Sequence, residues 1–514
     1  MTAGHPSVRG PLDGSSQGLP GTGTGLRLRD IAAQILSAAL RAVDPAAAVH
    51  ANVQCSGGLL RIGPYRSYAL DALDRILVVG GGKAGAPMAA ALVEILDDRI
   101  GAGQLNVKAG YSTAANPWRV RFGGTSDASP ASGGVSGASA PGTEPVAGAA
   151  HPPAGRSRIG PIKLDEAGHP LPDDAGLAGA RRIEALLQGL APRDLVIVLL
   201  SGGGSALLPL PAHGITLGEY RALTDVLVRC GADITEINAV RKHCSRLQGG
   251  QLARLAAPAR VATLILSDVV GSPLDAIASG PTVPDRSTFG DALAVLERHE
   301  VVGRVPPAVL DRLRLGAAGG ISDTPKPGDP AFERVVNVVV GDNAVAGRAA
   351  AAEAQRLGLR SALLTTFVQG EAREVGRAVA GLAQGIACGQ SDFAAPACLV
   401  LGGETTVTVR GDGLGGRNQE LALGAAIALD GHMLPTGVQV AVVSLGTDGT
   451  DGPTGAAGAI ATQDTLARGR ALGLDARAAL AANDSYRYLA ALGDLVITGP
   501  TNTNVNDLIL VLCA

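Results

Sequence analysis

Residues 75–85 read RILVVGGGKAG, an apolar run that ends in three glycines, a lysine and a further glycine. A continuous apolar run of this length is typical of a strand buried on both faces, and the glycines indicate a tight turn directly after it. Alanine- and leucine-rich stretches with helical patterning separate this run from others like it. The alternation predicts parallel sheets covered by helices, and hence a doubly wound α/β protein.

Six further apolar runs occur, at 195–201, 261–267, 335–341, 398–403, 438–446 and 495–499. Ligands bind beyond the carboxyl ends of the strands in open α/β sheets. The segments that follow the runs are therefore the candidate site, and nearly all combine glycine with a polar or charged side chain. They read GGGKAG (80–85), SGGGSA (201–206), SDVVGSP (267–273), GDNAVAG (341–347), GGETTV (402–407), GTDGTDGPTG (446–455) and TGPTNTNVND (498–507). This pattern favours an enzyme whose site is built from many loops.

Low-complexity segments suggest how the chain is divided. Residues 1–25 are rich in Gly, Ser, Pro and Thr and predict a disordered leader. Residues 123–160 have almost no bulky apolar side chains and predict an insertion in a surface loop. Residues 316–330, rich in Gly, Pro and Asp, predict a linker between an N-terminal α/β domain at 26–315 and a C-terminal α/β domain at 331–514.

Composition excludes several classes of protein. Hydrophobic residues make up 46% of the 514, enough for large cores, and the formal net charge is only −3. Aromatic residues make up 2%, so a base-stacking surface for nucleic acid is not expected. No apolar run approaches the ~20 residues of a membrane span, and the N-terminus lacks the apolar core of a signal peptide. Six cysteines without a CxxC pair indicate reduced thiols and a cytoplasmic protein.

Two glycine-rich turns are candidate anion sites. Gly80, Gly82 and Gly85 formally satisfy the dinucleotide motif G-x-G-x-x-G, but the next extended stretch offers Lys108 and no acidic residue for a ribose. Lys83 and the backbone N–H groups at a helix start would instead suit a phosphate. The second turn, 201–205, frees backbone N–H groups to surround a phosphate or carboxylate. The alternatives are a solvated lysine and purely structural turns.

Charged side chains at other strand ends complete the set. Asp268 ends the run VATLILSD, where a carboxylate can accept a proton from a hydroxyl or hold Mg²⁺; capping the next segment is the alternative. Arg417 precedes a helical stretch and could clamp a carboxylate or phosphoryl group, or lie on the surface. The histidines form no zinc pattern. Comparable acidic positions in the second half are Glu404, Asp448 and Asp451.

Several long motifs resemble the glycerate 2-kinase family. In the first half they are GGGKAG, EAGHPLPDDAG (166–176), LSGGGSALL, INAVRKHCSRLQGGQLA (237–253) and LILSDVVGSPLDAIASGPT (264–282). In the second half they are LGGETTVTVRGDGLGGRNQELAL, SLGTDGTDGPTGAAGA and TGPTNTNVNDLILVL. The resemblance covers about residues 26–512 apart from the insertion. It implies a larger Rossmann-like domain, a smaller α/β domain and an active site in the cleft between them.

The resemblance also implies ATP-dependent, Mg²⁺-assisted phosphorylation of D-glycerate at its 2-hydroxyl. The catalytic residues it implies are Lys83, Asp268 and Arg417, with Asp268 as the Mg²⁺ ligand. A homodimer is compatible with the sequence, which does not fix the oligomeric state. The residues implied to contact substrate or nucleotide are Gly82, Ser201, Gly202, Gly203, Gly204, Ser205, Asn238, Arg241, Glu404, Asn418, Asp448 and Asn504.

Three positions depart from the residues common in that family, and two other functions stay open. Ser272 and Gly455 replace acidic residues, which puts the number of metal ions in doubt, and Asn502 stands where glycine is common. One rival is an NAD(P)H-dependent hydroxypyruvate reductase that uses the formal glycine motif. The other is a non-catalytic nucleotide or sugar-acid sensor.

Overall fold

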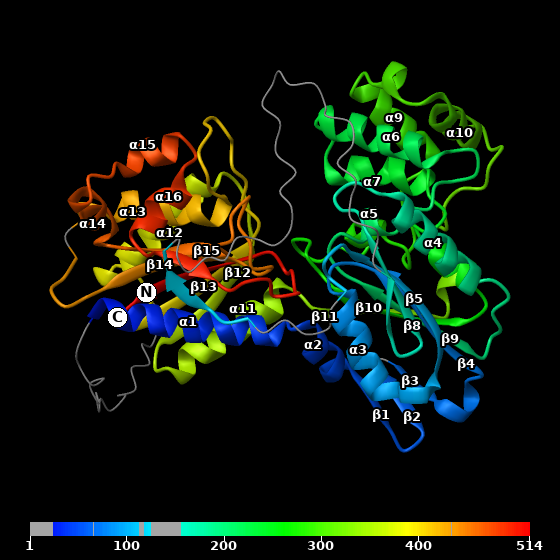
Figure 1. Cartoon of the computed structure of the whole chain (residues 1–514), viewed down its shortest axis with the longest axis horizontal. Helices are drawn as coiled ribbons and strands as arrows, with labels where there is room; N and C mark the ends of the chain where they lie inside the picture. Colours follow the sequence, from blue (N-terminus) through cyan, green and yellow to red (C-terminus); the bar gives the residue numbers. More distant parts are fainter. Residues whose placement is uncertain (1–23, 65, 113–117, 125–155, 433) are drawn as a thin grey trace, which may run out of the picture.

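The computed structural model describes residues 24–64, 66–112, 118–124, 156–432 and 434–514. These residues form two lobes, each built on a seven-stranded sheet (Figure 1). Residues 1–23 of the predicted leader and residues 125–155 of the predicted insertion lie outside the described residues, whereas residues 24–25 already belong to a helix.

The sheet of the first lobe has the order β11-β10-β9-β4-β5-β8-β7. All its pairs are parallel except β7–β8, which confirms the doubly wound parallel sheet. The chain moves from β4 to β5 and β8 on one side and then returns to β9 on the other, so the strand order reverses between β4 and β9. The strands are β4 (Arg75–Gly81), β5 (Ile100–Lys108), β7 (Arg156–Ile159), β8 (Ile162–Ala167), β9 (Asp194–Leu200), β10 (Arg260–Leu266) and β11 (Val335–Gly341).

Helices cover both faces of this sheet. One face packs in a hydrophobic cluster with α2 and α3, and the other packs in a separate cluster with α4 and α8. A small antiparallel sheet, β1 (Val53–Ser56), β2 (Leu59–Ile62) and β3 (Arg66–Ala69), lies beside them. The helices are α2 (Pro45–Asn52), α3 (Gly85–Leu96), α4 (Asp174–Leu186), α5 (Gly204–Leu207), α6 (Leu217–Arg229), α7 (Ile234–His243), α8 (Gln251–Ala256), α9 (Phe289–Arg298) and α10 (Pro307–Ala317).

The sheet of the second lobe is mixed rather than parallel. Its order is β12-β13-β17-β14-β15-β16-β6, and only β12–β13 is parallel. The central strands β13, β14 and β17 are buried throughout, because helices cover both faces. A continuous apolar run therefore reports burial on both faces and not strand direction. The strands are β6 (Arg121–Gly123), β12 (Arg360–Val368), β13 (Ala397–Gly403), β14 (Val440–Gly446), β15 (Gly458–Thr462), β16 (Leu495–Ile497) and β17 (Asp507–Cys513).

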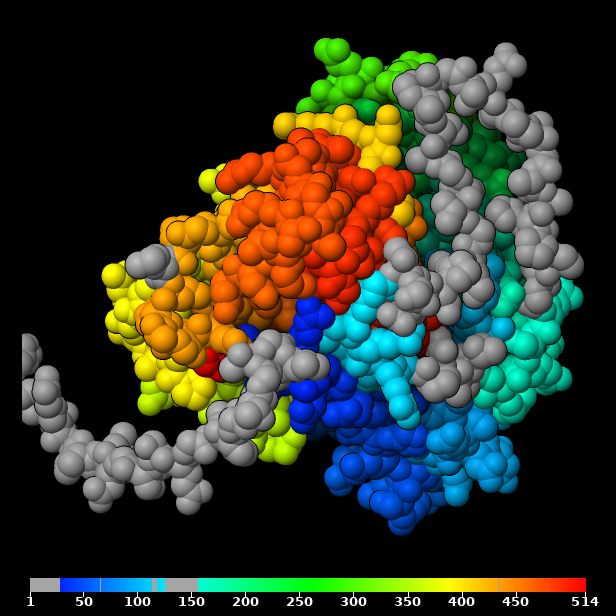
Figure 2. Space-filling view, turned by 60° about the vertical axis from the view of Figure 1, so that its left-hand side comes forward, coloured from blue at the N-terminus to red at the C-terminus, as the bar shows by residue number. Residues whose placement is uncertain are grey.

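Two segments from the N-terminal part of the chain belong to the second lobe. Helix α1 packs along α11, and its Arg29 forms an ion pair with buried Asp494. Strand β6 pairs with β16 at the sheet edge, and Figure 2 shows its cyan residues between the dark blue N-terminal and the orange-red C-terminal residues. The helices of this lobe are α1 (Thr24–Ala42), α11 (Asn343–Arg356), α12 (Ala372–Ala387), α13 (Arg417–Leu429), α14 (Thr465–Ala471), α15 (Ala476–Ala481) and α16 (Ser485–Ala491).

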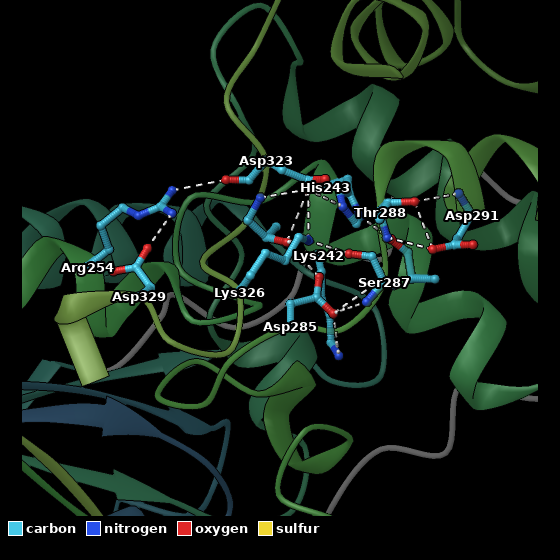
Figure 3. A network of polar contacts seen from close by, with 12 residues as sticks. Lys242, His243, Arg254, Asp285, Ser287, Thr288, Asp291, Asp323, Lys326 and Asp329 are labelled. Atoms are coloured by element: carbon cyan, nitrogen blue, oxygen red, sulfur yellow. Dashed lines mark hydrogen bonds and ion pairs between the residues drawn. The ribbon is translucent and has the colours of Figure 1, made fainter. Parts of the chain in front are cut away.

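The segment predicted as a linker, 316–330, lies against the first lobe instead of separating the lobes. Asp323 Oδ1 is 2.8 Å from Nε2 of the buried His243 (Figure 3). The Thr324 hydroxyl donates to Oδ2 of Asp285 at 2.9 Å. Strand β11, which follows, is the edge strand of the first sheet. After the first lobe's remaining elements, the chain passes into the second lobe between β11 and α11. Gly, Pro and Asp mark turns here, and side-chain hydrogen bonds fix those turns.

No helix in the described part of the chain is long and apolar enough to cross a membrane.

Candidate active site

The two predicted glycine-rich turns lie against each other where the strand order of the first sheet reverses. Lys83 N–H donates to the carbonyl of Gly202 at 2.9 Å, and Ala84 N–H donates to the Ser201 hydroxyl at 3.0 Å. Gly82 has φ of +149°, and a Cβ on it would overlap the Ser201 hydroxyl. The glycine is therefore required by the approach of the second turn. Ligands bind at such a reversal point in doubly wound sheets.

Lys83 and Asp268 of the first lobe meet side chains of the second lobe. The Lys83 ammonium lies 4.0 Å from Oδ2 of Asp448, and its side chain is only 16% exposed. Asn504 Nδ2 donates to Oδ2 of Asp268 at 3.3 Å. Burial raises the pKa of the Asp268 carboxyl, the charge of Lys83 offsets part of this rise, and the charge of Asp448 adds to it. The four residues thus bring an ammonium, two carboxylates and an amide together.

Arg417 is held by two carboxylates within the second lobe. As the first residue of α13, it donates from Nε and Nη2 to Asp507 at 2.6 and 2.9 Å, and its Nη1 lies 3.1 Å from Glu404 Oε1. Burial opposes the charge on Arg417, but the hydrogen bonds and charge of Asp507 raise its pKa overall. Burial also raises the pKa of both carboxyls. Asp507 is thus a partner of Arg417 that the sequence motifs did not single out.

Asn418, next to Arg417 in α13, points into the interior of the second lobe. Its side chain is buried, with Nδ2 donating to Asp451 Oδ1 at 3.2 Å and Oδ1 accepting from the Ser444 hydroxyl at 2.5 Å. Asp451 also accepts from the backbone N–H groups of Asn418 and Gln419 at the start of α13. Burial raises the pKa of Asp451 to about 7. Both residues therefore fix the helix that presents Arg417, and a direct contact of Asn418 with a ligand stays a prediction.

Ser205 and Asn238 lie behind the second glycine-rich turn. The hydroxyls of Ser205 and Ser279 are 3.0 Å apart, and Ser279 donates to Oδ1 of buried Asn238 at 2.8 Å. Arg241, one turn further along α7, is half-buried. This chain of contacts connects α7 to the turn, so these residues adjoin the site through side chains. Gly203 has φ of +83°, and Gly204 begins α5.

Three residues near Lys83 were not among the predicted site residues. Lys108 is the last residue of β5, and its ammonium lies 5.1 Å from the centre of the Tyr111 ring. His169 follows β8. Burial and the charge of Lys83 lower the pKa of Lys108 and of His169, the latter to about 4 with a further contribution from Lys108. Strands β5 and β8 are more polar than the apolar runs used to find strand ends. The strand-end rule applied to them would have found Lys108 and His169.

The predicted Mg²⁺ site rests on few residues. In the described ranges, no three His, Cys, Asp or Glu side chains are grouped so that they could hold a metal ion. The Lys83 ammonium lies 4.0 Å from Asp448 Oδ2, and its charge also acts on the Asp268 carboxyl.

Comparisons with known proteins find relatives over most of the chain. A model described as a domain of unknown function matches residues 31–314, and a MOFRL family model matches residues 397–507. A glycerate 2-kinase of Pyrococcus horikoshii is 35% identical over 94% of this chain and 97% of its own length. The chain belongs to the glycerate kinase family.

Other members of the glycerate kinase family support this assignment. A D-glycerate 2-kinase of Thermotoga maritima is 37% identical over 85% of this chain and 90% of its own length. The crystal structure of a glycerate kinase from the same organism matches with a TM-score of 0.77 over 95% of this chain and all of that chain. A protein of Agrobacterium vitis, 39% identical over 85% of this chain and 98% of its own length, carries the provisional name hydroxypyruvate reductase.

Two of the three departures from common glycerate kinase residues take left-handed backbone conformations. φ is +51° at Ser272 and +60° at Asn502. Asparagine tolerates this region better than most residues, so Asn502 keeps a turn that glycine would also allow. The departure at 502 is therefore a matter of backbone geometry. The effects of Ser272 and Gly455 on metal binding stay predictions.

Proposed function

We propose that the protein transfers the γ-phosphoryl group of ATP to the 2-hydroxyl of D-glycerate, giving 2-phosphoglycerate and ADP. The observation that carries this proposal is the meeting of Lys83 and Asp268 from the first lobe with Asp448 and Asn504 from the second. Phosphoryl transfer depends on positioning and charge neutralisation, which a site shared between two lobes supplies.

Asp268 is the proposed proton acceptor. Its carboxyl has a raised pKa because of burial, and a carboxylate of raised basicity accepts a hydroxyl proton more readily. The 2-hydroxyl oxygen of glycerate forms the new bond to the γ-phosphorus, the bond from that phosphorus to the β–γ bridging oxygen breaks, and the hydroxyl proton moves to Asp268. Lys83 neutralises charge on the transferred group. Arg417 has one side of its guanidinium bound to Asp507 and presents its Nη1 side near Glu404.

The carboxylates near Lys83 fit Mg²⁺. This ion is usually held by one or two carboxylates with phosphate oxygens and water as the other ligands, so a preformed group of three protein ligands is not needed. Asp448, beside Lys83, would hold it and leave the Asp268 carboxylate free to accept the hydroxyl proton; Asp268 as the ligand is the alternative assignment. When bound, Mg²⁺ would neutralise phosphate charge.

The hydroxypyruvate reductase alternative has weaker support. The ribose of a dinucleotide is usually bound by an acidic residue at the end of the second strand. Strand β5 pairs with β4 in that position and ends in Lys108. The space in front of Gly80 and Gly82 is filled by Leu199 and Ser201, so protein packing accounts for both glycines. The sensor alternative leaves unexplained why an ammonium and two carboxylates converge.

One preparation tests all three functions. Purified protein is incubated with D-glycerate, ATP and Mg²⁺, and the products ADP, 2-phosphoglycerate and 3-phosphoglycerate are measured. The same protein is incubated with hydroxypyruvate and NADH or NADPH. We expect ADP and 2-phosphoglycerate in equal amounts, and loss of about 10²–10³ in kcat for Lys83→Met. Oxidation of NAD(P)H without ADP would establish the reductase, and ligand binding without either reaction would establish the sensor.

A further inference from the structure

Three cationic or basic side chains gather at one edge of the first sheet. Lys83 follows β4, Lys108 ends β5, and His169 lies two residues beyond β8. These three strands are parallel neighbours in the order β4-β5-β8, so their carboxyl ends meet at the same edge. The topology therefore brings together side chains that are far apart in the sequence.

Gly203 fixes the position of His169. A Cβ on Gly203 would lie 2.8 Å from Cδ2 and 2.9 Å from Nε2 of the imidazole, so the ring rests directly on this glycine. Gly203 belongs to the same turn as Gly202, whose carbonyl accepts a hydrogen bond from the Lys83 N–H. The imidazole thus lies next to the loop that carries Lys83. Neither ring nitrogen, nor the ammonium of Lys108, is hydrogen-bonded to another described residue.

The basic side chains of this group act on one another. Burial is the main cause that lowers the pKa of His169, and the charges of Lys83 and Lys108 lower it further. Burial and the charge of Lys83 also lower the pKa of Lys108, while the charge of Asp448 raises it. Tyr111 also faces Lys108 and Asp448, and burial raises its pKa. Lys83 contacts Asp448, whose charge also acts on Lys108, while the charges of Lys83 and Lys108 both act on His169. Several negative charges would relieve the repulsion among the basic groups, and a chain of phosphates carries them.

We propose that Lys108 and His169 bind the polyphosphate of the nucleotide, with the phosphates running from Lys83 toward the ends of β5 and β8. This inference rests on the proposed function and states how the nucleotide is oriented in the proposed site. The transferred group lies at Lys83, the leaving phosphates lie over the first sheet, and the acceptor hydroxyl approaches from the side of Asp268. The same groups should bind a short polyanion such as pyrophosphate.

Binding measurements test the proposal. Pyrophosphate and the β,γ-imido analogue of ATP are titrated calorimetrically into the native protein and into Lys108→Gln, Lys108→Arg and His169→Asn. One lost charged hydrogen bond corresponds to about a ten- to hundredfold loss of affinity, which we expect for Lys108→Gln with both probes. Lys108→Arg should recover most of the affinity. Lys163→Gln, an exposed lysine on β8, is the matched control and should stay within about twofold.

A second readout reports on His169 directly. The carbon-bound ring protons of His169, assigned by their loss in His169→Asn, are followed by NMR as the pH is lowered with and without pyrophosphate. Phosphate charge favours the protonated ring, so the pKa should rise from about 4 when pyrophosphate binds. Thermal unfolding of each variant checks that the fold is kept.

Each outcome has one meaning. If Lys108→Gln leaves both affinities within twofold and the pKa of His169 does not move, the inference is wrong, whatever the activity. If Lys108→Gln raises KM for D-glycerate and leaves KM for ATP unchanged, the group binds the substrate carboxylate, and the inference is again wrong. If both probes bind through Lys108 but no phosphoryl transfer occurs, the inference stands and the proposed function fails.

Discussion

Gly202 is a position where a single methyl group would displace a proposed catalytic side chain. A Cβ there would overlap Oδ2 of Asp268 and lie 3.4 Å from Asn504 Nδ2, while φ is not in the left-handed region. Gly202→Ala should therefore displace the Asp268 carboxylate without straining the backbone. A displacement of about 1 Å in a catalytic group costs on the order of 10² in rate. We expect a fall of that size in kcat with little change in the melting temperature.

Gly303→Ala is the matched control for this substitution. Nothing lies within 4 Å of a Cβ on Gly303, and its φ is also outside the left-handed region. Its kcat should equal that of the native protein. Equal rates for Gly202→Ala and Gly303→Ala would mean that the carboxylate of Asp268 is not placed by this contact or does not take part.

The ion pair between Arg417 and Asp507 gives a second prediction at this scale. Asp507→Asn keeps the size of the side chain but removes the charge and one acceptor from a bidentate pair. We expect kcat to fall about tenfold or more and the free energy of unfolding to drop by about 1–3 kcal/mol. Asp430→Asn, which breaks the exposed pair with Arg470, should cost less than about 1 kcal/mol and leave kcat unchanged.

A double-mutant cycle separates positioning from stability. If Asp507 acts by holding Arg417, then Arg417→Gln combined with Asp507→Asn should have the same kcat as Arg417→Gln alone. Additive losses in kcat would show that Asp507 acts on the reaction independently of Arg417.

Helix α12 allows a prediction at the scale of the element. Gly381 is exposed in the interior of this helix, and nothing lies within 4 Å of a Cβ on it. Gly381→Ala should raise the free energy of unfolding by about 0.5–1 kcal/mol, because alanine loses less backbone entropy. Gly473, exposed after α14 with φ of +73°, should respond oppositely and lose about 1 kcal/mol. Urea denaturation measures both, and a stabilised Gly473→Ala would contradict the argument.

The strands show where sequence patterns succeed and where they fail. The apolar runs at 75–80, 195–201 and 261–267 correspond to β4, β9 and β10, because burial on both faces leaves a continuous apolar signature. Strands β5 and β8 carry buried polar residues such as Asn106 and Asp165, which interrupt that signature. The antiparallel pairing in the second sheet depends on the path of the chain between strands, and no local pattern encodes that path.

At the scale of the whole molecule, the site is assembled from distant segments. Asp268 and Asn504 are hydrogen-bonded across 236 positions of the sequence. The motifs predicted that Lys83, Asp268 and Asp448 follow strands, and this placement brings them to neighbouring loops. The Arg417–Asp507 pair forms where the start of α13 meets the start of β17, a contact that motif spacing does not encode. His169 follows β8, which lacks the continuous apolar run that was used to find strand ends.

Helix α1 and strand β6 come from the N-terminal part of the chain but belong to the second lobe. We therefore predict that the C-terminal residues of this lobe do not fold without them. Residues 343–514 produced separately lack α1 and β6, so they lose the Arg29 partner of buried Asp494 and one edge strand. We expect this fragment to show no cooperative thermal transition by calorimetry. Fusing residues 24–42 to it through a flexible linker should restore part of the transition. A cooperative transition in the fragment without α1 would contradict the prediction.

The position of β6 also bears on how such a chain can change over evolutionary time. Strand β6 belongs to the sheet of the second lobe and β7 to the sheet of the first, so the chain crosses from one lobe to the other between them. Lineages can therefore gain or lose sequence at this point at little cost to either core. A gene exchange that replaces everything after position 343 would bring in most of a new second lobe. Its helix α1 and edge strand β6 would still come from the recipient, because both precede position 343 in the sequence. Such hybrids should survive only between close relatives.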